Sequence, residues 1–168
     1  VKANHLGSDI QPSLTSYGGD STVLKAFSTS GDLVINGVSV GRSFAEDDKL
    51  SNQGTGAASA IAKVAAINRV SDLSGVVAKV AGTTVSGSAV DSTTQLSATG
   101  NITINGYRTA NIGVTTDAAL SRKLVAAAIN AISGATGVTA KDTESDNGGV
   151  VLFAADGRNI SVSFSALS

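Results

Sequence analysis

The sequence contains no cysteine, no methionine and no tryptophan, and it has a single proline. Without cysteine the chain cannot form a disulfide, a thiolate metal site or a cysteine nucleophile. Aromatic residues make up only 4% of the chain, so a core must be built from valine, isoleucine, leucine and alanine. Because ligand pockets are usually lined with aromatic and bulky apolar side chains, this composition disfavours a large pocket.

Charge is also scarce: the net charge is −1 and charged residues make up 15% of the chain. No basic tract could neutralise a phosphate backbone, and no strongly cationic amphipathic helix is visible, so nucleic-acid and membrane partners are not expected. No apolar run approaches the ~20 residues that span a bilayer. Residues 1–5 form no apolar signal segment, and because the chain starts without methionine we expect a fragment or a processed product.

The chain does contain an internal duplication. Three short patterns of the first half return in the second half in the same order, and the copies differ mainly in the length of one loop. Such a difference is tolerated because the entropy of loop closure grows slowly with loop length. The matched stretches are 31–37 with 100–106, 66–71 with 128–133, and 75–78 with 137–140.

Each copy opens with the pattern of a β-hairpin. Residues 33–35 and 102–104 alternate apolar with other side chains, which is the period of a strand. An Asn-Gly pair follows directly in both copies, and this pair is typical of the type I′ turn in two-residue hairpins. The return strand is clear at 38–40 and weaker at 107–111. The two turns are Asn36-Gly37 and Asn105-Gly106.

The period then changes to that of an amphipathic helix, over residues 57–73 and 117–133. Thr116-Asp117 is a good helix start, and Gly75 and Gly134 or Gly137 are good stops. Strands are predicted next at 76–80 and 138–141. The expected apolar faces are Ala60, Val64 and Ile67 with Ile61, Val70 and Leu73, and Leu124, Ala128 and Ala131 with Val125, Ile129 and Ile132.

The second copy continues with a strand at 150–153, a hairpin turn at Asp156-Gly157 and a strand at 160–164. The sequence therefore predicts an α+β fold of two tandem β-hairpin/α-helix/β-strand units, with small, mainly antiparallel sheets each covered by one Ala-rich helix. The expected parts are an irregular segment at 1–30, a first β-β-α-β unit at 31–82, a Ser/Thr-rich connection at 83–99, and a second unit at 100–168 with an added C-terminal hairpin.

At these residues the chain resembles the variable region of bacterial flagellins. The shared pattern is a strand ending in Ile-Asn-Gly, an Ala-rich helix ending in Ala-Ile-Asn, and then Gly-Val-x-Ala. Residues 153–160, Phe-Ala-Ala-Asp-Gly-Arg-Asn-Ile, are similar to the hairpin that commonly follows in flagellins. The resemblance covers residues 31–80 and 100–164, and the two ordered copies make it specific where Ile-Asn-Gly alone would be weak.

The resemblance implies the outer, surface-exposed domain of a flagellar filament subunit, an extracellular structural protein that supports motility and antigenic display. It implies no enzyme activity, no cofactor and no metal. Flagellins assemble with other subunits mainly through long terminal helices, and no such pattern stands at either end of this chain, so an excised central region is expected. Surface Ser and Thr in the 83–99 connection would be candidates for O-linked glycans, as in the outer domains of some flagellins.

Other interpretations stay open. Filament-cap and hook-associated proteins share this motif in their outer domains, and an adhesin-type binding module belongs to a second class. An enzyme is disfavoured because no convergent set of acid, base, nucleophile and metal ligands can be named. His5, the only histidine, has no evident triad partner. Gly54-Thr55-Gly56 lacks the lysine and preceding strand of a phosphate-binding loop.

Several residues have both a structural and a ligand-binding interpretation. For the asparagines of the two Asn-Gly turns and for Asn68 and Asn130 we expect turn geometry and hydrogen bonds to nearby backbone. Glu46-Asp47-Asp48 lacks the spacing of a calcium loop, and a solvated loop is expected there. A better candidate for a cation site is a set of three acidic residues at every second position near two glycines, although a loop is favoured here too. These residues are Asp142, Glu144 and Asp146.

Overall fold

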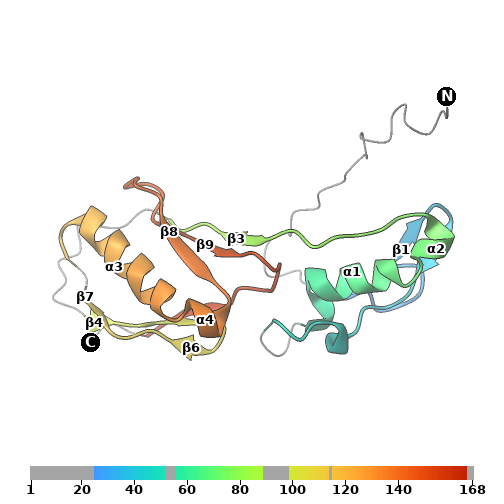
Figure 1. Ribbon diagram of the computed structural model, residues 1–168, viewed down its shortest axis with the longest axis horizontal. Helices are drawn as coiled ribbons and strands as arrows, with labels where there is room; N and C mark the ends of the chain where they lie inside the picture. The colour runs from blue at the N-terminus through green and yellow to red at the C-terminus, as the bar shows by residue number, and fades with distance from the viewer. Residues whose placement is uncertain (1–24, 52–55, 89–98, 114, 166–168) are drawn as a thin grey trace, which may run out of the picture.

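The computed structural model describes residues 25–51, 56–88, 99–113 and 115–165. Within them the chain forms short helices and small antiparallel sheets, so the predicted α+β class is confirmed. The elements gather into two lobes joined end to end, and these correspond to the two copies of the repeat (Figure 1). We call residues 31–82 the first unit and the residues from 99 onward the second unit.

The first unit begins with the hairpin of β1 (Leu33–Ile35) and β2 (Val38–Val40). Asn36 and Gly37 at its tip have φ of 50° and 80°, as a type I′ turn requires. Two 3₁₀ turns, η3 (Ala45–Asp47) and η4 (Gly56–Ala58), lead to α1 (Ala60–Asn68) and the single-turn α2 (Ser71–Ser74). The buried apolar residues of this unit are mostly small: Val40, Ala58, Ala62 and Ala66.

The hairpin of the second unit is interrupted by a β-bulge. β5 (Ile102–Ile104) pairs with β6 (Tyr107–Arg108), and β4 (Thr99–Gly100) pairs with β7 (Ile112–Gly113). The register passes from Thr103 opposite Arg108 to Gly100 opposite Ile112, which leaves one extra residue on the return strand. The Thr109 side chain accepts a hydrogen bond from the Ile102 amide there (3.0 Å), so the weak return strand predicted at 107–111 is split into two short pieces.

The rest of the second unit packs a helix on a sheet. α3 (Ala118–Ala131) is capped by Asp117 and is followed by α4 (Ser133–Thr136), β8 (Thr139–Asp142), β9 (Val150–Ala154) and β10 (Val162–Phe164). β3 (Thr83–Val85), β9 and β8 form an antiparallel sheet in that order, and α3 packs against β8 and β9. The core of the second unit, to which β5 and β7 also contribute, contains Ile102, Ile104, Ile112, Ala126, Ile129, Val138, Ala140, Leu152 and Ala154.

The apolar faces of the helices agree with the sequence only in part. In α3 the row of Val125, Ile129 and Ile132 packs on the core as predicted, whereas Leu124 remains exposed. In α1 the innermost residues are Ala62 and Ala66, which belong to neither predicted row, and Ala60 and Leu73 of the predicted rows are exposed. Small alanines allow the helix backbone to approach its neighbours closely, so the most buried row is the smallest one rather than the most apolar one.

One predicted strand and one predicted hairpin are wrong. Residues 76–80 form no strand, and the chain from Gly75 to Gly82 runs past α1 as a single segment that leads into β3 (Figure 1). The C-terminal hairpin at Asp156-Gly157 is absent as well, because β9 and β10 lie in different sheets and β10 pairs with β5. Gly157 has a φ of 73°, and a side chain there would collide with Val80, so the turn is pressed against the first unit instead of closing a hairpin.

Candidate functional site

The asparagines of the two Asn-Gly turns make the same contact in each unit. Asn36 donates from Nδ2 to the carbonyl of Ser74 (2.8 Å), at the end of α2. Asn105 donates from Nδ2 to the carbonyl of Thr136 (3.2 Å), at the end of α4. Each bond fastens the tip of a hairpin to the last turn of the helical segment that follows it.

The asparagines at the ends of the long helices also have matching contacts. Asn68 donates to the carbonyl of Ala78 (3.0 Å) and accepts from its amide (2.8 Å). Asn130 makes the same pair of bonds to Ala140, at 2.9 Å and 2.8 Å. A side-chain amide satisfies both backbone groups of one residue in this way, so the predicted bonding to nearby backbone is confirmed.

The residues between these asparagines match too. Ser71 and Ser133 donate from Oγ to the carbonyls of Asn68 (2.9 Å) and Asn130 (2.8 Å). Gly75 and Gly137 then end the short helices in the left-handed conformation, at φ of 72° and 69°. We refer to these equivalent bonds of the two units as the motif contacts. They explain why the same asparagine, serine and glycine residues recur in both units while the residues between them differ.

The two turns differ in their surroundings. Asn105 is buried, and its Oδ1 also accepts from the amide (2.8 Å) and the hydroxyl (3.3 Å) of Ser161. The Asn105 amide in turn donates to the Ser161 carbonyl (3.0 Å), which continues the ladder between β5 and β10. Asn36 is exposed. The same residue therefore closes a turn in the first unit and joins three segments in the second.

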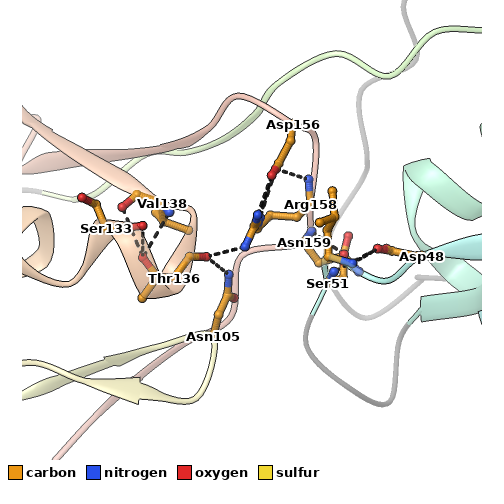
Figure 2. A network of polar contacts seen from close by, with 10 residues as sticks. Asp48, Ser51, Asn105, Ser133, Thr136, Val138, Asp156, Arg158 and Asn159 are labelled. Carbon is orange, nitrogen blue, oxygen red and sulfur yellow. Dashed lines mark hydrogen bonds and ion pairs between the residues drawn. The ribbon is translucent and has the colours of Figure 1, made fainter.

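A polar network lies where the two units meet (Figure 2). The Arg158 side chain reaches toward α4 and donates from Nη1 to the Thr136 carbonyl (2.9 Å), the oxygen that Asn105 also contacts. Asp156 pairs with the Arg158 guanidinium at 2.6 Å. From the other side, Ser51 Oγ of the first unit accepts from the Asn159 amide (2.9 Å). We call these residues the junction network.

The charges of the junction network stabilise one another. Hydrogen bonds from the Arg158 side chain lower the pKa of the Asp156 carboxyl, and the same bonds raise the pKa of the Arg158 guanidinium. An open hollow of about 280 Å³ lies beside this pair, and Lys49 and Tyr107 also line it. Because the guanidinium is already bonded to a carboxylate and a carbonyl, its role in this arrangement is to hold segments together.

The first acidic cluster is not a solvated loop throughout. Asp47 pairs with Arg69 at the end of α1, whose guanidinium also stacks over the Phe44 ring. Asp48 is only 7% exposed, and its Oδ1 accepts from the amides of Leu50 and Ser51, both at 2.9 Å. Burial works against its charge, yet hydrogen bonds from the side chains of Ser51 and Ser59, together with those from the two amides, prevail and the pKa of Asp48 is lowered. The predicted solvated loop is therefore wrong for Asp48, which shapes the turn beside the junction.

The second acidic cluster binds the side chain of an arginine, where the sequence offered a metal-ion site as the alternative. Arg122 of α3 is only 4% exposed and bonds Asp142 through Nε (2.8 Å) and Asp146 through Nη1 (2.6 Å). Asp142 also accepts from the Glu144 amide (2.9 Å), which is the largest cause of its lowered pKa, and Arg122 lowers it further. Two of the three predicted ligands thus share one guanidinium, and no group of three metal-ligating side chains occurs within the described residues.

The outer face of the β3–β9–β8 sheet carries an open hollow of about 670 Å³. Hydroxyl, aliphatic, aromatic and charged side chains line it. The residues that line it include Thr84, Thr139, Lys141, Val151 and Phe153. The hollow is therefore an open surface of mixed polar and apolar side chains.

Other sequence candidates fall elsewhere. His5, Gly54, Thr55 and most of the 83–99 connection lie outside the described residues, and Gly56 opens η4. Arg122 and Arg158 were not identified from the sequence, because the partners of Arg122 are distant along the chain and Arg158 reaches a distant backbone carbonyl in addition to the nearby Asp156. The Asp-Gly-Arg letters at 156–158 were the one available signal.

In the described part of the chain, no helix has both the length and the apolar character needed to cross a membrane. Comparison of the chain with protein-family models, with curated proteins and with solved structures finds no match.

Proposed function

We propose that this chain is the outer, surface-exposed domain of a bacterial flagellar filament subunit, with a structural role in display and motility and no catalytic activity. The observation that carries the proposal is the set of motif contacts. The letters that resemble the flagellin variable region, Ile-Asn-Gly and Ala-Ile-Asn, are the residues that tie hairpin to helix and helix to the following segment in both units.

The motif contacts support the proposal because they give the resemblance a physical reason. A motif that recurs by chance has no cause to place its asparagines in equivalent bonds 69 or 62 residues apart, at Asn36 and Asn105 or at Asn68 and Asn130. A folding module defined by a few polar ties and a small aliphatic core leaves the remaining surface free to vary. Such a module suits an outer domain that must fold after export and be displayed.

Filament-cap and hook-associated proteins, and an adhesin-type module, are the competing proposals. Gold labelling of intact cells of the source organism would distinguish these proposals. The antibodies would be raised against the purified chain and depleted of cross-reacting species by affinity. Labelling along the whole filament is expected. Labelling confined to the filament tip would favour a cap protein, and labelling at the hook a hook-associated protein.

If the cell surface were labelled and the filaments were not, the filament assignment would be overturned and an adhesin would be favoured. Antibodies against the same chain carrying Ile129→Asp provide a matched control, because they report unfolded epitopes and should label intact filaments weakly. A binding measurement of the chain on a glycan array would test the adhesin alternative directly, and strong binding to one glycan class would count against a purely structural role.

A further inference from the structure

We infer that the first unit has an open strand-acceptor edge at residues 76–79, and that it binds an extended apolar segment of another polypeptide chain in antiparallel orientation. This inference goes beyond the proposed function and does not depend on it. It rests on comparison of two equivalent segments within the same molecule: residues 76–80 after α2, and residues 138–142 after α4.

The two segments are held on one side in the same way. Asn68 brackets Ala78 and Asn130 brackets Ala140 through equivalent pairs of hydrogen bonds. Side-chain exposure alternates in step as well, because Val77 and Lys79 point outward like Thr139 and Lys141. Position by position, residues 76–80 are therefore prepared as a strand.

On the other side the segments differ. Successive residues of a strand direct their backbone groups to opposite edges. Since Ala140 bonds to Asn130, Thr139 and Lys141 face β9, where they stand opposite Phe153 and Val151. The equivalent residues Val77 and Lys79 must face away from Asn68, and within the described part of the chain their amides and carbonyls have no hydrogen-bond partner.

The burial of equivalent side chains also shows that the first unit lacks a strand in the position of β9. Val138 is fully buried and Ala140 nearly so in the second unit, where β9 completes the sheet. Their equivalents Val76 and Ala78 are only half-buried, and Val77 is 70% exposed. The cover that β9 gives to one unit is absent from the other.

The chain itself does not supply this strand from β9. The ladder between β3 and β9 ends where Thr83 stands opposite Ala154. Beyond that point the chain turns at Asp156-Gly157, and Gly157 abuts Val80 and Ala81. The open edge therefore begins just where β9 leaves the sheet, and it continues toward α2.

The occupant is specified by β9, the strand that fills the equivalent position in the second unit. Its sequence, Val-Val-Leu-Phe-Ala, is uncharged, and Leu152 and Ala154 turn inward beneath α3. The partner is thus an extended, uncharged segment with apolar side chains at alternating positions. Backbone bonds would supply the affinity and the alternating side chains the selectivity, as in other cases of strand addition.

A first measurement tests whether the edge is open in the chain alone. Amide hydrogen exchange at Val77 and Lys79 is expected to be fast and independent of protein concentration. Slow exchange that becomes fast when residues 1–24 are removed would mean that the chain covers its own edge. Protection that rises with concentration would mean that a second copy covers it. Either result would overturn the proposal of a foreign partner.

A second measurement tests the geometry with a synthetic peptide of residues 148–156, added to isotope-labelled protein and followed by NMR. The amides of Val77 and Lys79 are expected to shift and to become protected. N-methylation of the peptide at Phe153 removes a donor that faces the edge and should weaken binding about tenfold. N-methylation at Leu152, whose amide faces the opposite side, is the matched control and should change binding less than about twofold.

Substitutions in the protein complete the test. Lys79→Pro removes an edge amide and should abolish the peptide-induced shifts, whereas Lys79→Ala retains the amide and should bind as the wild type does. Equal loss with both methylated peptides would overturn the proposal. So would shifts at Thr139 and Lys141 without shifts at Val77, since the peptide would then be replacing β9 in the second unit.

Discussion

Asn130 holds Ala140 by both ends of its side-chain amide, donating to the carbonyl at 2.9 Å and accepting from the amide at 2.8 Å. One polar side chain thereby fixes where the helix ends and where the next strand begins. Because Ala140 belongs to the core of the second unit, its backbone groups would have no water to replace these bonds.

We expect Asn130→Ala to lower the free energy of unfolding by about 1–3 kcal/mol, because it leaves a buried amide and carbonyl without partners. Asn68→Ala should cost less, since Ala78 is half-buried and water can bond its backbone. Urea denaturation of both variants checks the order. Equal losses would contradict the difference in burial between Ala140 and Ala78.

Ile129 is only 2% exposed in the middle of the second core. Ile129→Asp places an unpaired charge there and should destabilise the protein by at least about 3 kcal/mol. Ile129→Val, the matched control, should cost about 0.5–1.5 kcal/mol. Thermal unfolding followed by circular dichroism measures both, and an unchanged melting temperature for Ile129→Asp would contradict the assigned helix face.

The lowered pKa of Asp142 predicts a pH dependence of stability. The Glu144 amide and Arg122 favour the charged carboxylate in the folded state. The stabilisation is therefore complete above the unfolded pKa of about 4 and is lost as the pH falls through the lower folded value. Melting temperatures measured from neutral to strongly acidic pH should fall less steeply for Asp142→Asn than for the wild type.

Asp146→Asn serves as the control for that experiment. Its carboxyl also bonds Arg122, but the Asp146 side chain is 81% exposed, against 15% for Asp142. Exposed ion pairs contribute little, so the acid sensitivity of Asp146→Asn should stay close to that of the wild type. A larger effect at Asp146 than at Asp142 would argue that the exposed bond dominates.

Asp32 offers a local titration that NMR can follow directly. Its Oδ2 accepts from the amides of Ser28 (2.6 Å) and Thr29 (3.1 Å), and these bonds, led by that of Ser28, lower its pKa to about 2. The carboxyl carbon shift should titrate near that value, and the Ser28 and Thr29 amides should move with it. A midpoint near the usual aspartate pKa of about 4 would mean that this turn is open in solution.

The two Asn-Gly turns should age at different rates. Deamidation begins when the glycine nitrogen attacks the asparagine side-chain carbon; ammonia leaves, and water opens the resulting ring to aspartate or isoaspartate. Asn36 is exposed with one side-chain bond, whereas Asn105 is buried with three. Peptide mass spectrometry after prolonged incubation at mildly alkaline pH should find the product at position 36 well before position 105.

Unfolding the protein in urea should bring those two rates together, because the neighbouring residue is glycine in both cases. Gly37→Ala should slow the reaction at Asn36 only. If Asn105 reacted as fast as Asn36 in the folded protein, the bonds to Thr136 and Ser161 would not be holding its side chain.

Local signals in the sequence predicted local structure well. The Asn-Gly turns, the start of α3 at Asp117 and the stops at Gly75 and Gly137 follow from residues that are adjacent along the chain. The duplication itself was also visible, because the polar ties recur at the same places. The turns, the start of α3 and the two stops are each determined within about one turn of backbone.

Features that depend on distant partners were missed. Residues 76–80 have the letters of a strand, but a strand needs a neighbour, and the segment that fills this place in the second unit turns away at Gly157 before it reaches the first. Arg122 looks like an ordinary helix surface residue until Asp142 and Asp146 are brought over it. β10 was predicted to fold back on β9, yet bonds between Asn105 and Ser161 direct it to β5.

β3 lies before the second copy of the repeat in the sequence but inside the sheet of the second copy in space. A gene segment that began at Thr99 would encode a protein in which β9 had lost one neighbouring strand. The edge of β9 at Leu152 and Ala154, which pairs with β3, would then be unpaired. Duplication, deletion or transfer of this repeat between genes should therefore carry the preceding stretch from Thr83 with it. The inheritable module is offset from the repeated motif by the length of its own connecting strand.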